Sequence, residues 1–441
     1  MSRKFISTLG TGNYLSCKYY NKDISIETRF IQEALIEMYM NNPTKDDKVV
    51  IFITEKAWQK NWCNNDDSST GLKDILDKKY PDINVKAVKI KEGNSEEELW
   101  DTFDKILNEI EDDDNIIFDI THGFRSIPMQ VLAVINYAKV IKNNVNLLGI
   151  YYGAYEARNK LTNEAPIFNV SIYNDILNWT SAANSFINYG NSDEIYDLYN
   201  EKLANGHKEI RPLEKFIRAL KDFTNTISTC RGKIIKKSET KDYKKRMKRS
   251  IREAAFQVNE NLSTLNSISE KDKLSIKPFE RLFNKINYRL KDFDCDSNLE
   301  IGIATIKWCK KNHLIQGAYT AIDETIKTYV CNKYGLDDTL KENRDLICKS
   351  AMINMIRENR KAYIDMKITK SEDLKIYNKI KDTLPIEIAV LANKVSKLRN
   401  DINHFGFLDK SSSYVKFEDD LDNIINEFLS ILDKYNNKDF I

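Results

Sequence analysis

The order of strand-like and helix-like segments is the feature that most constrains the fold of this chain. In its N-terminal part, apolar runs at 49–54 and 115–120 alternate with segments of helical apolar spacing, such as 28–40 and 127–141. Apolar runs of this length, bounded by charged residues, indicate strands that are buried on both faces. Alternation of such strands with helices predicts a doubly wound, mostly parallel sheet with helices on both faces.

A last apolar run at 167–172 ends this alternation, and the pattern beyond it is helical. Only 14 glycines and 7 prolines occur in 441 residues, which leaves room for long uninterrupted helices. The sequence therefore predicts a Rossmann-like α/β domain over residues 1–172 and a helical linker over 173–205. An all-α domain is expected over residues 206–441.

The composition argues against several classes of protein. Apolar residues make up 41% of the chain, yet no apolar run approaches the ~18–20 residues that a membrane span needs, so we expect no membrane partner. The polar segment 10–13 interrupts the N-terminal apolar residues before they reach signal-peptide length, which favours a cytoplasmic location. The seven cysteines are scattered without a Cys-x-x-Cys pair, so neither a disulfide framework nor a zinc site is indicated.

Two polar segments follow predicted strands of the sheet. Leu9-Gly-Thr-Gly-Asn13 follows the first strand, and Thr121-His-Gly-Phe-Arg-Ser126 follows the strand at 115–120. In open parallel sheets ligands bind beyond the carboxyl ends of the strands, and glycines allow backbone amides to approach a ligand closely. The candidate ligand-binding residues are Gly10, Thr11, Gly12, Asn13, Thr121, His122, Gly123, Arg125 and Ser126.

These segments predict a phosphate- or nucleotide-binding edge, with the forked donors of Arg125 suited to phosphate. The alternatives are an ordinary tight turn at Gly-Thr-Gly and a histidine that serves only the core. The spacing fits neither Gly-x-Gly-x-x-Gly nor a P-loop, because position 15 is Leu and no Gly-Lys-Ser/Thr occurs. A dinucleotide or ATP site is therefore not indicated.

A second motif, Arg399-Asn-Asp-Ile-Asn-His404, lies at the end of a predicted helix over 386–405 and contains one of only four histidines. Asn400 and His404 face the same way on a helix, whereas Arg399 and His404 lie about 140° apart. Both can reach one target only if the helix unwinds or a second chain completes the site. A histidine can exchange protons at neutral pH and an arginine can stabilise a phosphate transition state, while RNA supplies its own 2′-hydroxyl nucleophile. No metal is then required.

The two polar segments of the predicted sheet domain resemble those of a known protein family. Asp119-Ile-Thr-His-Gly123, with Leu9-Gly-Thr-Gly-Asn13 upstream, is similar to the Asp-x-Thr-His-Gly group of CRISPR-associated proteins. Their N-terminal CARF domain is Rossmann-like and binds cyclic oligoadenylates made by type III CRISPR complexes. The resemblance implies that residues 10–13 and 121–126 line this pocket, and that two chains share one ring-shaped ligand in a homodimer.

The C-terminal motif resembles the Arg-x4-His signature of HEPN ribonucleases, which are all-α and form composite sites in dimers. It implies catalytic roles for Arg399, Asn400 and His404. Together the resemblances imply a metal-independent endoribonuclease of antiviral defence that is activated by cyclic oligoadenylate. It would act as a homodimer or a higher oligomer, without a cofactor, and cut single-stranded RNA to 2′,3′-cyclic phosphate ends.

Two other functions stay open from the sequence. One is a ligand-binding transcription regulator without catalysis. The other is a ring nuclease that degrades the cyclic oligoadenylate, for which Thr11, Thr121 and His122 are available. The basic segment 231–252 is either a solvated surface or the wall of an RNA groove.

Overall fold

The computed structural model describes residues 2–63, 70–123, 126–204, 210–235, 238–268, 277–356, 368, 370–407 and 409–436. The chain divides into two compact units, residues 1–175 and 176–441. Each unit has its own hydrophobic core, so each is described by itself.

The first unit is built on one eight-stranded sheet with the strand order β3-β2-β8-β7-β6-β1-β4-β5. Five of its seven strand pairings are parallel, and only β2–β3 and β7–β8 are antiparallel. The predicted mostly parallel sheet is therefore confirmed. The strands are β1 (Arg3–Leu9), β2 (Cys17–Tyr20), β3 (Ser25–Thr28), β4 (Lys48–Ile53), β5 (Asn84–Lys89), β6 (Asn115–Asp119), β7 (Asn146–Gly153) and β8 (Glu164–Asn169).

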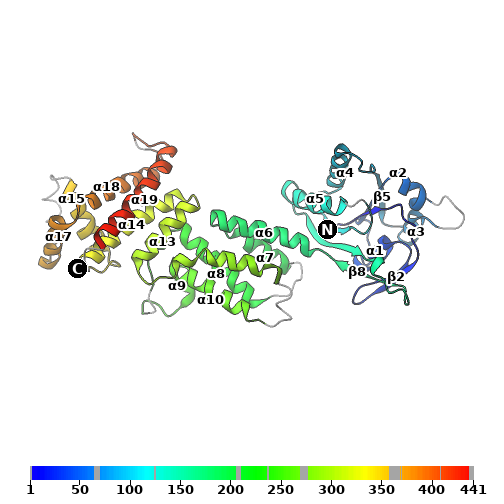
Figure 1. Cartoon of the computed structure of the whole chain (residues 1–441), viewed down its shortest axis with the longest axis horizontal. Helices are drawn as coiled ribbons and strands as arrows, with labels where there is room; N and C mark the ends of the chain where they lie inside the picture. The colour runs from blue at the N-terminus through cyan, green and yellow to red at the C-terminus, as the bar shows by residue number, and fades with distance from the viewer. Residues whose placement is uncertain are drawn as a thin grey trace. The chain divides into compact units, whose positions relative to one another are not determined.

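Helices cover both faces of this sheet (Figure 1). Alternate residues of β4 enter different cores, because successive side chains of a strand point to opposite faces. Ile51 packs with α1 (Ile31–Tyr39) and α3 (Leu72–Lys79) on one face. Phe52 packs with α4 (Glu96–Asn108) and α5 (Ile127–Ile141) on the other. The sheet is thus buried on both sides, as its continuous apolar strands predict.

Two strands, β2 and β3, were not predicted from the sequence. Each has only four residues, and both contain charged or polar side chains that lie exposed. Their apolar signal is therefore too short to separate from a loop. They extend the sheet beyond β8, the last strand of the predicted set.

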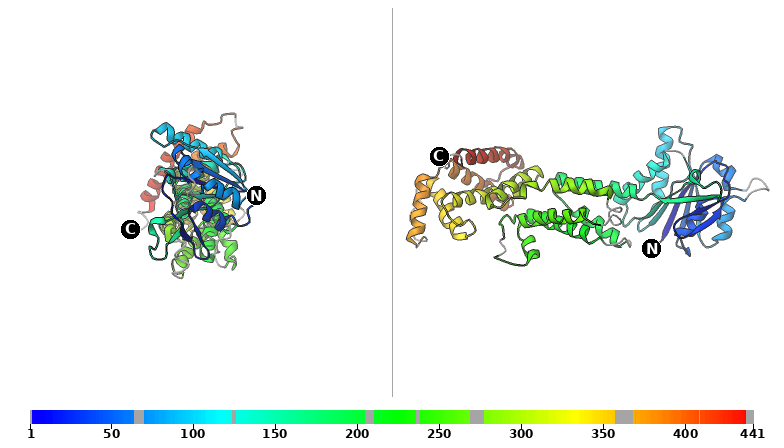
Figure 2. Two further views of the ribbon diagram at one scale, coloured as in Figure 1. Left: turned by 90° about the vertical axis from the view of Figure 1, so that its right-hand side faces the viewer. Right: turned by 60° about the horizontal axis from the view of Figure 1, so that its bottom comes forward.

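The second unit is helical, and no strand occurs among its described residues. Its green-coloured helices run side by side in the right-hand view of Figure 2. The main ones are α6 (Ile172–Tyr189), α7 (Asp193–Ala204), α8 (Arg211–Ser228), α10 (Ile251–Asn266), α12 (Glu280–Tyr288), α13 (Asn298–Lys311), α14 (Ile315–Lys333), α15 (Ser350–Ile356), α17 (Ser371–Thr383), α18 (Ile386–Asn403) and α19 (Tyr414–Asn436). The predicted all-α character is confirmed.

Helix α14 is central to the C-terminal part of this unit, since it packs against α13, α18, α19 and the π-helical segment Glu342–Lys349. Helices α6 and α7 contribute Trp179, Phe186 and Ile195 to the core of the second unit. The division into domains with a linker over 173–205 stays a prediction. Within the described residues, no helix is both long and apolar enough to span a bilayer.

Candidate functional sites

The structure brings the two polar segments of the sheet domain together. Strands β1 and β6 are parallel neighbours, so their carboxyl ends lie at the same edge of the sheet. The Thr8 hydroxyl donates a hydrogen bond to the carbonyl of His122. A Cβ atom added to Gly10 would lie 3.5 Å from the His122 Cβ and 3.9 Å from the Gly123 nitrogen. The first loop therefore packs directly on the second.

The buried carboxylate of Asp119 holds this edge of the sheet together through hydrogen bonds. Asp119 is fully buried and accepts hydrogen bonds from the Ser7 hydroxyl (2.7 Å), the Thr121 amide (2.9 Å) and the Thr121 hydroxyl (2.6 Å). The Thr121 hydroxyl in turn accepts a bond from the Gly153 amide at 2.8 Å. The Thr121 side chain therefore fixes the loop that follows β6 to the end of β7. Burial raises the pKa of Asp119, although the three hydrogen bonds and His122 oppose this shift.

His122 lies against an aromatic neighbour. Its ring centroid is 4.5 Å from that of Tyr14, which also packs edge-to-face on Phe30 at 5.6 Å. Burial lowers the pKa of His122, despite the opposing charges of Asp119 and Glu156. The imidazole is therefore neutral near pH 7 and offers hydrogen bonds without a positive charge.

Asn61 is a residue of this site that the sequence reasoning missed. Its side chain is 1% exposed, and its amide group donates to the carbonyl oxygens of Gly10 (2.9 Å) and Gly12 (3.0 Å). Arg29 donates to the Asn61 side-chain oxygen at 3.4 Å and to the Tyr14 carbonyl at 3.1 Å. Asn61 follows β4, the parallel neighbour of β1, and this position at the same edge was its only sequence signal.

The other predicted residues form the open part of the edge. Thr11, Gly12 and Asn13 are exposed, and Gly123 is exposed with a φ of +122°. A side chain at Gly123 would also approach the Thr8 hydroxyl to 2.9 Å, so this position requires glycine. Ser126 is the N-cap of α5, and Pro128 lies in its first turn, where a missing N–H costs no helical hydrogen bond. Arg125 lies outside the described residues.

The C-terminal motif lies on α18, whose buried residues Ile388, Leu391, Val395 and Leu398 form an apolar stripe along the helix. Arg399 lies beside this stripe, faces α14 and is 18% exposed. Its Nη1 donates to the Asp323 carboxylate at 2.5 Å, and its Nη2 donates to the Asn400 side-chain oxygen at 3.0 Å. Its Nε is buried without a hydrogen-bond partner among the described residues.

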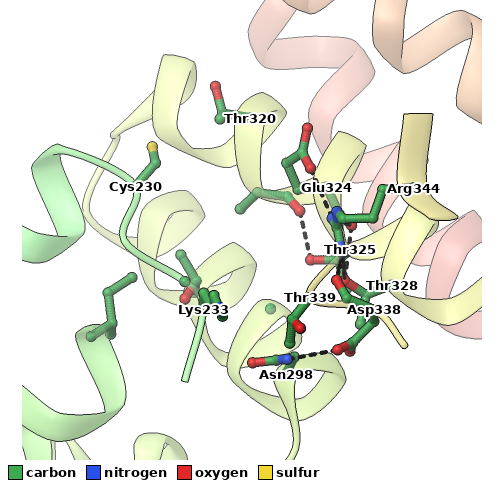
Figure 3. Close-up of a pocket in the computed structure, with 15 residues that line it drawn as sticks. Cys230, Lys233, Asn298, Thr320, Glu324, Thr325, Thr328, Asp338, Thr339 and Arg344 are labelled. Atoms are coloured by element: carbon green, nitrogen blue, oxygen red, sulfur yellow. Dashed lines mark hydrogen bonds and ion pairs between the residues drawn. The ribbon is translucent and has the colours of Figure 1, made fainter. Parts of the chain in front are cut away.

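Arg399 belongs to a chain of charges along α14. Lys327 pairs with Asp323 (2.9 Å) and with Glu324 (2.6 Å), and Arg344 donates to Glu324 at 2.8 Å. Figure 3 shows the Arg344 end of this network, beside a polar pocket lined by threonines. Partial burial acts to raise the pKa of Glu324, but Lys327 and Arg344 outweigh it and lower the pKa to about 2. Glu324 therefore stays ionised at neutral pH, and the Asp323 and Glu324 carboxylates together contact three cations, Lys327, Arg344 and Arg399.

His404 is the C-cap of α18 and is exposed, and its amide still bonds to the Asn400 carbonyl at 2.9 Å. The helix therefore continues to the motif's end, and the separation of about 140° between Arg399 and His404 is retained. No hydrogen bond joins these two side chains within the part of the chain that the structure describes. One chain brings Arg399 and Asn400 together, but not His404.

The basic segment 231–252 is partly engaged in internal ion pairs. Lys233 pairs with Glu239, and Arg246 and Arg252 both pair with Glu253. These pairs favour a structural role for the three cations. For the described residues, no group of three or more His, Cys, Asp or Glu side chains is placed to hold a metal ion.

Comparison with known proteins agrees with the architecture of the first unit. Residues 4–164 match the family model of the CARF domain of the CRISPR system endoribonuclease Csx1. The CRISPR-associated protein MJ1674 of Methanocaldococcus jannaschii is 27% identical over 399 residues, which cover 79% of this chain and 56% of the relative. The chain thus spans about half the length of the curated relative that it matches.

A solved structure of Enterococcus italicus Csm6, bound to cyclic hexa-2′-fluoro-hexa-dAMP, aligns over 98% of this chain and 94% of its own, with 11% identity and a TM-score of 0.45. Similarity at this level establishes neither a shared fold nor a shared ligand. The family match and the relative both agree with the Asp119–Gly123 motif and with the sheet that carries it. The first unit is therefore a CARF domain, and the chain as a whole is similar to a CRISPR-associated protein.

Proposed function

We propose that this chain is an endoribonuclease of type III CRISPR defence, activated by cyclic oligoadenylate, that cuts single-stranded RNA without a metal ion. The observation that carries the proposal is the joining of two features in one chain. A domain that matches the Csx1 CARF model precedes a helical unit that carries the half-buried Arg399 and the exposed Asn400 and His404 at the end of α18.

The activator would bind at the edge formed by the loops after β1 and β6. Exposed Thr11, Gly12 and Asn13 present polar groups there, and the N-terminus of α5 favours the negative charge of phosphates. Asn61 and Asp119 would fix the two loops, so that little order has to be gained when the ligand binds. A ring of repeated adenylates suits a two-fold pocket made by a homodimer.

Cleavage would follow transesterification within the RNA. The 2′-oxygen attacks phosphorus and loses its proton, the bond from phosphorus to the 5′-oxygen breaks, and that oxygen takes up a proton. The products are a 2′,3′-cyclic phosphate and a 5′-hydroxyl. His404 would transfer protons, and Arg399 would stabilise the negative charge that develops at phosphorus.

Arg399 and His404 diverge on one helix, so the proposal requires that two chains build the site together. The Arg399 Nε–H has no partner in the described structure, but it is buried, so the activated arrangement would have to expose it before it could donate to a phosphate oxygen. His404 is exposed at the helix end and can reach a neighbouring chain. Activator binding would act by bringing two such motifs to one RNA phosphate.

Substitution of His404 tests this assignment. His404→Ala should lower the rate of cleavage of a labelled single-stranded RNA by about 10²–10⁴, the usual contribution of a placed proton donor or acceptor. His313→Ala is the matched control, because His313 is also exposed and lies at a helix end outside the motif. An active His404→Ala protein would reject the assignment, as would products that lack a cyclic phosphate.

Ring-nuclease activity and a purely regulatory, DNA-binding role stay as alternatives. The Thr121 hydroxyl is already held by Asp119 and Gly153, which leaves Thr11 and His122 as the freer groups for ring cleavage. Incubation of labelled cyclic adenylate with the His404→Ala protein separates ring cleavage from RNA cleavage. A gel shift on duplex DNA, with and without the ligand, tests the regulatory role.

A further inference from the structure

A cavity of about 240 Å³ lies beside the Arg399 motif in the second unit. Three elements enclose it: α14, the segment that runs from Lys349 through α15, and the polar face of α18. The α18 residues on this face follow helical spacing at 393, 396, 397 and 400. The cavity therefore opens on the same side of α18 as Asn400.

The cavity carries a surplus of positive charge. Lys327, Lys349 and Lys397 line it against a single carboxylate, Asp323. Lys327 is neutralised by Asp323 at 2.9 Å and by Glu324. Lys349 and Lys397 have no ion pair within the described ranges, so two ammonium groups remain for an anionic ligand.

The rest of the lining supplies hydrogen bonds and an apolar surface. Asn393 and Ser396 add neutral polar groups beside Lys397. Met352, Ile353 and Ile356 provide apolar side chains from α15. Cations, neutral hydrogen-bonding groups and an apolar wall are the combination that a nucleotide needs for its phosphate, sugar and base.

The cavity is joined directly to the proposed catalytic arginine. Both acceptors of the Arg399 guanidinium line it, namely the Asp323 carboxylate at 2.5 Å and the Asn400 side-chain oxygen at 3.0 Å. A strand that places one nucleotide in the cavity therefore passes its next phosphate close to Arg399.

We propose that this cavity is a binding subsite for one nucleotide of the single-stranded RNA, adjacent to the phosphate that is cut. Lys349 and Lys397 bind its phosphate oxygens, and the α15 side chains pack against its base. This assignment rests on the proposed function, because it takes RNA as the substrate.

The test measures RNA affinity in the absence of cleavage. In a His404→Ala background, Lys349→Ala and Lys397→Ala are compared by fluorescence anisotropy with a labelled single-stranded RNA over a range of salt concentrations. Loss of one phosphate contact should reduce the slope of log K against log[salt] by about 0.7. The double variant should bind at least about tenfold more weakly, while Lys397→Arg, which retains the charge, should keep most of the affinity.

Lys307→Ala is the control, since Lys307 is exposed on α13 and does not line the cavity. Unchanged affinity and salt slope in the double variant would overturn the subsite, even where His404→Ala has abolished cleavage. A failure of the proposed function would be recognised by a different result. If His404→Ala still cuts RNA, the proposed function is wrong, whatever the two lysines contribute to RNA binding.

Discussion

At the scale of single residues, the C-terminal motif depends on Asp323, which is 4% exposed and lies between two cations. Arg399 and Lys327 both contact its Oδ2 atom, at 2.5 and 2.9 Å. Removing one member of a buried ion pair leaves the others desolvated without compensation, and this costs more than the net contribution of the pair itself. Asp323 therefore positions Arg399 and does not need to touch a substrate.

We expect Asp323→Asn to lower the free energy of unfolding by about 3 kcal/mol or more, because Lys327 and Arg399 lose the charge between them. Asp422→Asn is the matched control, since Asp422 pairs with Lys310 at 2.7 Å on the surface and should cost less than about 1 kcal/mol. Urea unfolding of both variants gives the comparison. Equal losses in free energy of unfolding for the two substitutions would show that the buried ion pairs of Asp323 contribute no more to stability than a surface ion pair.

At the scale of elements, the end of α18 determines where His404 points. The chain leaves this helix through two residues in the left-handed region, Phe405 (φ +56°) and Gly406 (φ +75°). Glycine adopts this conformation readily, whereas other residues are strained in it. The turn therefore stops the helix directly after His404.

Replacement of Gly406 measures this effect. Gly406→Ala should destabilise the protein by about 1–2 kcal/mol through backbone strain alone, because an added Cβ meets nothing within 4 Å. Gly232→Ala is the control, since its Cβ also meets open space and its φ is not in the left-handed region. Thermal unfolding should show Gly232→Ala to be neutral or slightly stabilising. A neutral Gly406→Ala would contradict the strain argument.

The loop after β1 depends on Asn61 in a similar way. Asn61→Ala removes both hydrogen bonds that hold the Gly10 and Gly12 carbonyls, so the free energy of unfolding should fall by about 1–3 kcal/mol. Affinity for cyclic oligoadenylate should fall as well, because the loop must then be ordered on binding. Calorimetric titration of Asn61→Ala measures this. Gln59→Ala, on the exposed side of the same π-helix (Trp58–Trp62), is the control.

How far the sequence could predict these features depends on the range of the interactions. Strands β4 and β6 and helix α18 follow from local apolar patterns, and the meeting of Gly10 with His122 follows from the rule for parallel strands. The contacts of Asn61 and Asp323 were not predicted. Asp323 lies 76 residues from Arg399, so their contact exists only because α14 packs against α18.

At the scale of the whole molecule, the chain joins a CARF domain to a helical unit that carries the proposed catalytic groups. The loops at the sheet edge and the motif at the end of α18 are each held by hydrogen bonds or ion pairs. Neither feature alone would be sufficient for the proposed RNA cleavage. Within one chain Arg399 and His404 diverge, so the proposed cleavage requires a second chain and an activator that brings the two motifs together. The proposed mechanism therefore makes RNA cleavage dependent on the activator.

The most direct test measures the initial rate of single-stranded RNA cleavage by the wild-type protein in EDTA, with and without cyclic tetra- or hexa-adenylate. We predict that one of the rings raises the rate at least about tenfold, and that the activated rate is unaffected by the chelator. A rate that neither ring changes, or one that EDTA abolishes, would rule out the proposed mechanism.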